Sequence, residues 1–182
     1  MKSNVLKGTI MIIFVILFIS CAISQISASD NSTQTTMLTL SKGGVVMEYP
    51  SDWGNSKATS NDSVMAISKL DSIDAAGIGQ VNINIEKREI DQEFYSYLNS
   101  TYTSMQRDPS FHLISSGEMA VGDRTAVQYI YTSTENGVER EHKAVWFDDG
   151  GQVYVVLYSA PTDQFDSNSH VFDYILSQLK IP

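Results

Sequence analysis

Residues 112–160 read HLISSGEMAVGDRTAVQYIYTSTENGVEREHKAVWFDDGGQVYVVLYSA, and this stretch decides the fold. It contains four runs rich in β-branched and aromatic residues, which are typical of strands. Short polar sequences with Asn-Gly and Asp-Gly pairs separate the runs, and these pairs are strong signals for tight hairpins. The stretch therefore predicts a meander of four antiparallel strands, over residues 112–121, 125–133, 138–147 and 152–160.

The residues before the meander predict further strands. Two short apolar runs, Met37–Leu40 and Val45–Tyr49, flank the turn sequence Ser41–Gly44, which predicts a β-hairpin. Another short strand is expected over 64–70. The sequence QVNINIEKR at 80–88 alternates apolar and polar residues, and this alternation predicts a strand that is buried on one face only.

Two helices complete the pattern. Apolar residues recur at helical spacing over 92–106, and Asp91 is the expected N-cap of this helix. Pro161 ends the last strand of the meander, and a second amphipathic helix is expected after it with Asp163 as its cap. Strands and helices in this order predict the α+β class.

The first 29 residues predict an exported protein. Lys2 and Lys7 precede an almost purely aliphatic run from Ile10 to Ile19, and small residues follow at 27–29. A positive start, an apolar middle and a small-residue end are typical of a secretory signal peptide. Basic residues stay on the cytoplasmic side of a membrane, so we expect the rest of the chain on the outer side.

Three fates of this segment stay open. Cleavage near residue 29 would release the body of the protein. Residues 8–29 form an uncharged stretch of 22 residues, and ~20 apolar residues suffice to span a bilayer, so the segment can instead remain as an anchor. Cys21 follows a serine in a sequence that resembles a bacterial lipobox and is a weaker candidate for lipidation. Residues 30–36 then read as a polar linker, and residues 37–182 as one domain.

The charge of the body excludes one class of partner. Without Lys2 and Lys7 the chain keeps 10 basic and 21 acidic residues, a net charge of −11. Nucleic-acid binding needs a positive surface that neutralises phosphates. We therefore expect no nucleic-acid partner, and contact with a membrane only through the N-terminal segment.

No cofactor or metal site is predicted. The one cysteine, Cys21, lies in the apolar segment, and His112, His142 and His170 are far apart in the sequence. A zinc site would need several such ligands. Acidic pairs such as Asp148-Asp149 could hold a hard cation, but next to Gly150-Gly151 they read better as turn residues.

The chain also lacks a recognisable catalytic motif. No G-x-S-x-G sequence marks a nucleophile elbow. We therefore predict no catalytic residues and a protein that is not an enzyme. The alternative, a hydrolase that uses carboxylates, would need two acidic residues, or an acid and a histidine, to converge in a cleft.

One polar stretch stands out in the meander. Its residues are Glu139, Arg140, Glu141, His142 and Lys143, and they are polar on both faces of the expected strand. The simplest interpretation is that this part of the hairpin projects beyond the core into solvent. The functional interpretation is a contact surface. Tyrosines two residues apart in a strand lie on the same face, as Tyr129 and Tyr131 do. Such pairs are expected to pack in the core or to line a ligand cleft.

Three N-x-[ST] sequons are candidate glycosylation sites: Asn31, Asn61 and Asn99. The first two fall in expected loops, where a glycan has room. Asn99 falls on the expected outer face of the first helix.

The opening hairpin and the end of the chain resemble a known family. GGVVMEYPSDW at 43–53 is similar to the first hairpin of PsbP-like domains, and YVVLYSAP at 154–161 with the following helix resembles their last strand and closing helix. The resemblance covers about residues 37–181 and is strongest to the secreted single-domain PsbP-related proteins of methanogenic archaea. It implies a central antiparallel sheet of about six or more strands with two main helices packed on it.

The resemblance implies a binding role rather than a specific activity. Related domains assist the water-oxidising photosystem or, in a fungus, bind a nuclear GTPase, and neither partner is expected here. We predict a non-enzymatic extracytoplasmic binding or accessory module with an unknown protein partner at the outer face of the membrane. A structural component of the cell envelope is the main alternative.

Overall fold

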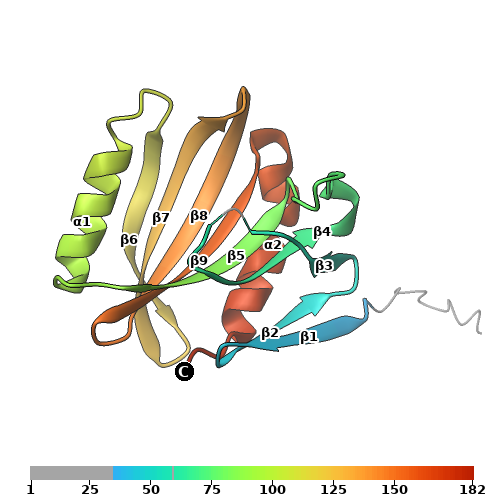
Figure 1. Cartoon of the computed structure of the whole chain (residues 1–182), viewed down its shortest axis with the longest axis horizontal. Helices are drawn as coiled ribbons and strands as arrows, with labels where there is room; N and C mark the ends of the chain where they lie inside the picture. The colour runs from blue at the N-terminus through green and yellow to red at the C-terminus, as the bar shows by residue number, and fades with distance from the viewer. Residues whose placement is uncertain (1–34, 59) are drawn as a thin grey trace, which may run out of the picture. The chain divides into compact units, whose positions relative to one another are not determined.

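The computed structural model describes residues 35–58 and 60–182. The main element is a seven-stranded antiparallel sheet in the order β3-β4-β5-β9-β8-β7-β6, and a separate two-stranded sheet is formed by β1 and β2 (Figure 1). The strands are β1 (Met37–Lys42), β2 (Val45–Pro50), β3 (Trp53–Asn55), β4 (Ser63–Lys69), β5 (Asn82–Glu89), β6 (His112–Val121), β7 (Arg124–Glu135), β8 (Val138–Asp148) and β9 (Gln152–Pro161). The helices are α1 (Phe94–Met105), α2 (Thr162–Gln178) and one 3-10 turn, Leu70–Ser72.

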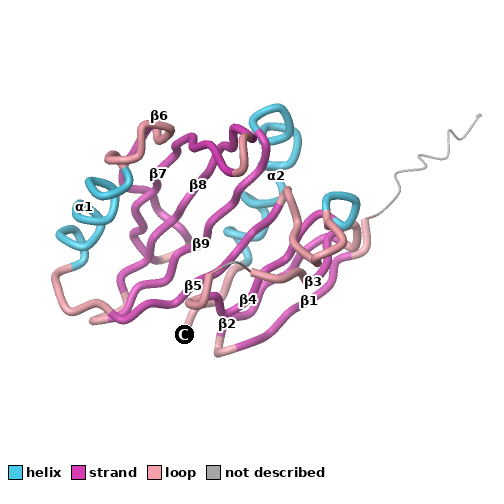
Figure 2. Tube along the Cα trace, turned by 45° about the horizontal axis from the view of Figure 1, so that its top comes forward, coloured by secondary structure: helices cyan, strands magenta, loops and turns pink. Residues whose placement is uncertain are grey.

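The two helices cover opposite faces of the large sheet. Ala144 and Trp146 of β8 pack with α1, whereas their neighbours Val145 and Phe147 pack with α2. Successive residues of a strand point to opposite faces, so the two helices must lie on opposite sides. Figure 2 shows the two helices in a second view. The predicted α+β class, with an antiparallel sheet and two main helices, is confirmed.

The meander is confirmed strand by strand. Strands β6, β7, β8 and β9 are consecutive neighbours, each antiparallel to the next. The β7–β8 turn contains Asn136 and Gly137 with φ of 53° and 80°, the left-handed conformation that this pair adopts in tight hairpins. This turn sets the pairing register in which Tyr131 lies opposite His142.

Three details differ from the sequence-based expectation. The short strand β3 was not predicted, because three residues after a proline turn are too few for a periodic pattern. The N-cap of α1 is Glu93, whose side chain accepts a hydrogen bond from Ser96 N, and not Asp91. Helix α2 begins directly after Pro161, so Asp163 lies in its first turn and does not cap it.

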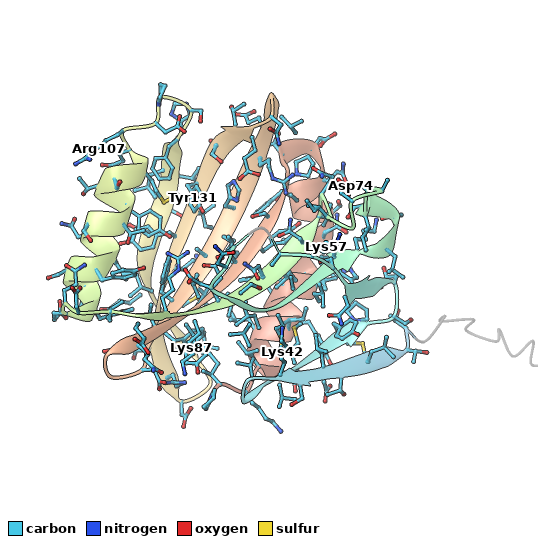
Figure 3. The ribbon with its side chains drawn as sticks, viewed as in Figure 1. Lys42, Lys57, Asp74, Lys87, Arg107 and Tyr131 are labelled. Atoms are coloured by element: carbon cyan, nitrogen blue, oxygen red, sulfur yellow. The ribbon has the colours of Figure 1, made fainter. Side chains whose placement is uncertain are left out.

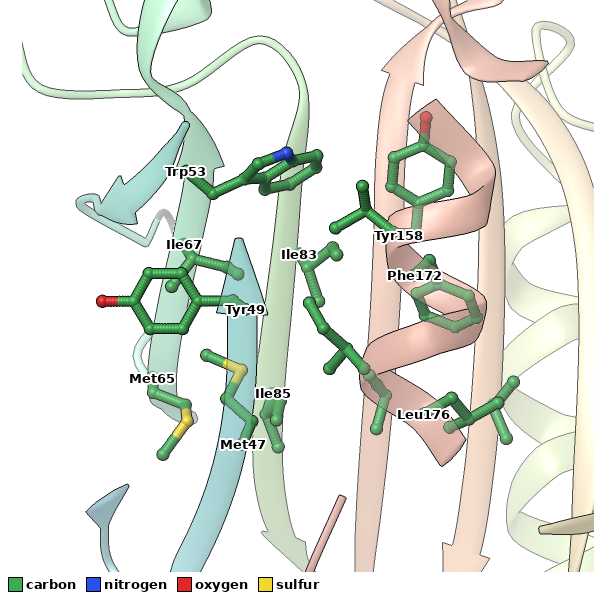
Figure 4. Packing of buried hydrophobic residues seen from close by; sticks show 14 of the residues in the cluster. Met47, Tyr49, Trp53, Met65, Ile67, Ile83, Ile85, Tyr158, Phe172 and Leu176 are labelled. Atoms are coloured by element: carbon green, nitrogen blue, oxygen red, sulfur yellow. The ribbon is translucent and has the colours of Figure 1, made fainter. Parts of the chain in front are cut away.

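The larger core lies between the sheet, α2 and the β1–β2 hairpin (Figure 4). Met47 and Tyr49 of β2 pack with Trp53 and with Phe172 of α2 in one buried cluster. Each such side chain contributes roughly 1.5–3 kcal/mol when it is fully buried. Backbone hydrogen bonds of 3.0 Å in both directions between Val46 and Lys180 tie the hairpin to the residues after α2.

The smaller core lies under α1 and is mainly aromatic. Tyr102 stacks on Tyr129 with ring centroids 3.5 Å apart, and its hydroxyl accepts a hydrogen bond of 2.9 Å from Trp146 Nε1. Phe94, Leu98 and Tyr102 form the buried face of the helix. Of the predicted tyrosine pair, Tyr129 packs against this core, and Tyr131 is buried in it and also lines the cleft described below. Neither helix in the described part of the chain is long and apolar enough to cross a membrane.

Candidate binding cleft

The face of β5 that was expected to meet solvent is buried. The outward residues Asn84 and Glu86 retain only 8% and 4% of their exposure. The prediction of a strand buried on one face only is therefore wrong, although Val81, Ile83 and Ile85 do form the predicted apolar face. Periodicity reports which face is apolar, but it does not report whether a neighbouring segment also covers the polar face.

The polar stretch of β8 is likewise not a projection into solvent. Arg140 and His142 are 4% and 3% exposed, whereas Glu139 is exposed and Glu141 and Lys143 are intermediate. The expectation that this stretch extends beyond the core is wrong for Arg140 and His142, because Gln80 of the 74–80 loop covers Arg140 and the ring of Tyr131 packs on His142. Whether the stretch is a contact surface stays a prediction.

These buried polar residues line one cleft of about 460 Å³ on the α1 side of the sheet. We call it the polar cleft. Its floor comes from β5, β7, β8 and β9, and its walls from the 74–80 loop, Met105 of α1 and the β7–β8 turn. The polar floor residues are Asn82, Asn84, Glu86, Ser133, Arg140, His142 and Ser159. Figure 3 shows Tyr131 near α1, with Lys57 and Asp74 on the opposite side of this region.

The strand register brings these residues together. Asn82 lies opposite Ser159, Ser159 opposite His142, and His142 opposite Tyr131, so the four form one row across four strands. Residues in register on one face of a sheet are close enough for side-chain contacts. The row therefore places a polar group of each inner strand at the same depth in the cleft.

The 74–80 loop is held by its own polar contacts. Asp74 Oδ1 accepts hydrogen bonds from Ala76 N and Ile78 N at 2.8 and 3.0 Å. Gly79 lies so close to Ser68 that an added Cβ would stand 2.0 Å from its Oγ. Only glycine allows the loop to approach β4 this closely, and the cleft wall depends on that approach.

One half of the floor centres on the carboxylate of Glu86, whose charge is balanced by Arg88. Glu86 Oε1 accepts a hydrogen bond of 2.8 Å from Asn84 Nδ2, and Glu86 Oε2 is paired with Arg88. Arg88 also contacts Asp62 at 3.2 Å and Tyr97 OH at 3.3 Å. Burial alone would lower the pKa of Arg88, but the hydrogen bond to Tyr97 and the charge of Glu86 outweigh it and raise this pKa above its usual value. A carboxylate with both oxygens engaged is stable when it is buried.

The other half of the floor centres on His142. Its Nδ1 lies 2.7 Å from Ser159 Oγ and its Nε2 lies 2.9 Å from Ser133 Oγ. The ring stacks on Tyr131 with centroids 4.7 Å apart. Burial, and then the charge of Arg140, lower the pKa of His142 to about 4. The imidazole is therefore neutral at ordinary pH, with one nitrogen donating and the other accepting.

Arg140 lies beside this histidine. Its Nη2 donates to Gln80 O at 2.6 Å and its Nη1 to Gln80 Oε1 at 3.2 Å. Its Nε makes no hydrogen bond, although Glu135 Oε2 stands 3.3 Å away. Burial lowers the pKa of Arg140, but a guanidinium remains charged at neutral pH.

The histidine and the carboxylates bear on the hydrolase alternative. Ser133 Oγ and His142 Nε2 are within the distance at which a base can activate a serine, and Glu135 Oε1 lies 4.0 Å from the same nitrogen. An acid and a histidine therefore do converge in a cleft. However, Nδ1 faces a serine and not a carboxylate, and a pKa of about 4 makes His142 a weak base at neutral pH.

The other predicted positions lie elsewhere. Asn61 is exposed in a turn and Asn99 is exposed on the outer face of α1, as expected; their glycosylation stays a prediction. Asn31 and Cys21, with the signal or anchor segment, lie outside the described residues. His112 and His170 are exposed and separate from the cleft.

The acidic pairs serve as turn residues. Asp148 Oδ1 accepts a hydrogen bond of 3.1 Å from Gly150 N, and Asp149 pairs with Arg124. In residues 35–58 and 60–182 no group of three or more metal-ligating side chains is close enough to hold an ion.

Sequence reasoning missed several residues of the cleft. Ser133, Ser159 and Gln80 contact His142 or Arg140, yet each is a common polar residue in an ordinary strand or loop. A signal was present for two of them. A tight turn centred between Asn136 and Gly137 pairs residue 133 with residue 140, and a turn centred between Gly150 and Gly151 pairs residue 159 with residue 142.

Comparison with known proteins places the chain in a family. The family model described as PsbP-like protein matches residues 9–181. A search of curated proteins gives no match. Among solved structures, cyanobacterial PsbP (CyanoP) from Synechocystis sp. PCC 6803 superposes with a TM-score of 0.57 at 17% identity, covering 86% of this chain and 99% of that chain.

LpqN of Mycobacterium tuberculosis, which is involved in cell envelope biogenesis, has the same fold. It superposes with a TM-score of 0.56 at 18% identity, covering 81% of this chain and 91% of that chain. Identities this low establish the shared fold alone, whereas the family model spans most of the sequence. This chain therefore belongs to the PsbP-like protein family.

Proposed function

We propose that this protein is a non-enzymatic extracytoplasmic binding or accessory module that takes up a small polar ligand in the polar cleft. The observation that carries the proposal is the floor of the cleft. Glu86, Arg140 and His142 are almost fully buried there, beside a space of about 460 Å³. Ligand sites are typically clefts of roughly 300–1,000 Å³ with a few well-placed polar groups.

Energetics favours a binding role for these residues over a purely structural one. A buried charge costs free energy unless it is paired, and well-packed apolar side chains often stabilise a core at least as well as an ion pair does. On the opposite face of the same strands, apolar residues such as Ile83, Ile85 and Val145 form the core. A polar floor on one face therefore suits recognition of a polar molecule.

Binding is proposed rather than catalysis because the cleft lacks a strong base. His142 has a low pKa and both oxygens of Glu86 are engaged. A hydrolytic role would need a base whose pKa is near the working pH. The cleft would contain such a base only if a bound substrate raised the pKa of one of these groups.

The proposed location is the outer face of the cytoplasmic membrane. The apolar segment with Lys2 and Lys7 supports export, with release, anchoring or lipidation at Cys21 as the three routes. The envelope role stated for LpqN and the resemblance to secreted proteins of methanogenic archaea agree with this location. A protein partner at that surface remains part of the proposal.

A ligand screen tests the proposed function. The purified domain, residues 35–182, is titrated with small neutral and charged polar fragments while amide chemical shifts are recorded. We expect shifts to concentrate at residues of the floor, including Ser133, His142 and Ser159. Fragments that bind only elsewhere, or none that bind at all, would contradict the proposal.

The screen needs a variant that alters the cleft without altering the outer surface. His142→Gln changes the floor, whereas His112→Gln changes an exposed histidine on β6. We expect the first substitution to weaken binding and the second to leave it unchanged.

A further inference from the structure

The carboxylate of Glu135 stands over the buried Arg140 without completing its hydrogen bonds. Glu135 Oε2 is 3.3 Å from Arg140 Nε, yet this N–H makes no hydrogen bond. The Arg140 side chain is 5% exposed, whereas that of Glu135 is 56% exposed. One partner is therefore fixed in the floor, and the other reaches over it from solvent.

Glu135 also approaches the second group of the floor. Its Oε1 lies 4.0 Å from His142 Nε2, the nitrogen that also contacts Ser133 Oγ. One carboxylate thus faces a guanidinium through one oxygen and an imidazole through the other. A guanidinium N–H forms strong charge-assisted hydrogen bonds with carboxylates, and the Ser133 hydroxyl beside His142 is a second polar group at the same place.

The contacts of Glu135 with Arg140 and His142 cost little free energy to break. Glu135 is the last residue of β7 beside the Asn136-Gly137 turn. An ion pair with one exposed partner contributes little, because solvent screens it and the long side chain loses freedom. A buried N–H without a hydrogen bond, in contrast, gains from any well-aligned acceptor.

We propose that Glu135 occupies the place of a ligand carboxylate, and that the polar cleft binds a small organic carboxylate that displaces it. The inference deepens the proposed function and rests on it. The ligand carboxylate would accept from Arg140 Nε and from the Ser133 hydroxyl, and Glu135 would turn outward into solvent. Glu135 is thus a tethered competitor of the ligand.

The charges around the cleft favour a single carboxylate over a phosphate. Arg140 and Lys57 are the cations that line it, and Asp74, Glu86 and Glu135 line it as well. A phosphate dianion would be repelled by these carboxylates. A monoanion balances Arg140 after Glu135 has moved away.

The test compares two charge-matched variants. Glu135→Gln removes the competitor, whereas Glu139→Gln removes another exposed carboxylate on the same hairpin. The probes are the monoanions acetate, propionate and an N-acetylated dipeptide with a free carboxyl end, titrated by NMR at constant ionic strength. Acetamide and the N-acetylated, amidated dipeptide are the neutral controls, and the dipeptide arm distinguishes a peptide end from a free acid.

We expect Glu135→Gln to bind the carboxylate probes about five-fold more tightly than the wild type, because competition for Arg140 is lost. Glu139→Gln should bind as the wild type does. Arg140→Lys keeps the charge but loses the fork of N–H groups, and it should weaken binding about ten-fold. A thermal unfolding curve shows whether this third variant is folded, and the two glutamate variants decide the question without it.

Several outcomes would overturn the inference, and two of them concern the variants and the neutral controls. One is that Glu135→Gln binds carboxylates no better than Glu139→Gln does. The other is that the amides bind the cleft as well as the acids do. Neutral fragments that bind the floor while carboxylates do not would leave the proposed function standing and remove this inference, whereas no binding by either class would remove both.

Discussion

His142 Nδ1 lies 2.7 Å from Ser159 Oγ, and this contact joins the side chains of the neighbouring strands β8 and β9 inside the polar cleft. The contact holds a neutral imidazole in a buried position. Because burial and Arg140 lower the pKa of His142 from 6.5 to about 4, the imidazole links protein stability to pH.

The first prediction concerns this linkage. Between pH 6.5 and 4 the unfolded chain binds a proton at His142 that the folded chain does not, so stability must fall as the pH drops through this range. At pH 4.5 we expect the wild type to lose about 2–3 kcal/mol through this group. His142→Gln should lack this loss, as urea unfolding at pH 7.5 and 4.5 can measure. Carboxylates titrate in both proteins, so an equal loss in the two would refute the prediction.

The second prediction concerns the buried carboxylate of the cleft floor. Glu86→Leu leaves Arg88 and Asn84 without their buried partner and should destabilise the domain by about 2 kcal/mol. Asp62→Asn removes the exposed partner of the same arginine and should cost less than about 0.5 kcal/mol. Denaturant unfolding of the two variants measures both values. Equal effects would mean that the burial of Glu86 carries no special cost.

The third prediction concerns two tyrosines on β9. The hydroxyl of Tyr154 is buried without a hydrogen bond, whereas that of Tyr158 donates to Phe165 O at 2.7 Å. Tyr154→Phe should leave stability unchanged or raise it by about 1 kcal/mol, and Tyr158→Phe should lower it by about 1 kcal/mol. Thermal unfolding of the two variants shows whether each substitution raises or lowers the stability. A loss on Tyr154→Phe would show that its hydroxyl has a partner in solution.

The fourth prediction concerns the wall of the cleft. Gly79→Ala would place a methyl group 2.0 Å from Ser68 Oγ, so the loop or β4 must shift. We expect a loss of about 2 kcal/mol and a change in amide shifts along the 74–80 loop. Gly117→Ala in β6 meets no atom within 4 Å and should have little effect. The idea fails if the two alanine variants are equally stable.

The fifth prediction concerns chemistry. Ser133 contacts a histidine of low pKa, and we expect no labelling of this serine by a fluorophosphonate probe at pH 7.5. Intact-protein mass spectrometry reads the result. Labelling that disappears in Ser133→Ala, with the variant still folded, would favour the hydrolase alternative.

Much of the fold could be predicted because its signals are local. The Asn136-Gly137 and Gly150-Gly151 turns define hairpins, and the same turns set which residues of β7, β8 and β9 lie opposite one another. Ser133 beside Arg140 and Ser159 beside His142 could therefore be inferred from turn positions alone. Periodicity instead predicts that the polar stretch 139–143 projects into solvent, whereas Arg140 and His142 are buried.

The contribution of β5 to the cleft could not be predicted in this way. Asn82 lies opposite Ser159, but α1 and the strands β6, β7 and β8 separate these two residues in the sequence. No turn sets that register, since it depends on how both cores pack. The position of the 74–80 loop is likewise a tertiary effect, because it depends on the close approach of Gly79 to Ser68 of β4.

The separate β1–β2 sheet has a mechanical consequence. Strand β1 is bonded to β2 alone, and β2 is bonded onward to Lys180 rather than to any strand of the seven-stranded sheet. Tension applied at Met37 therefore loads the β1–β2 ladder first. Strand β1 can peel from β2, starting at the Met37–Pro50 pair, without breaking any pair of the seven-stranded sheet, whereas β2 cannot leave without exposing Met47 and Tyr49 of the larger core. A pull from the N-terminal end would therefore cost the six pairs of this ladder before it disturbed any strand that lines the cleft.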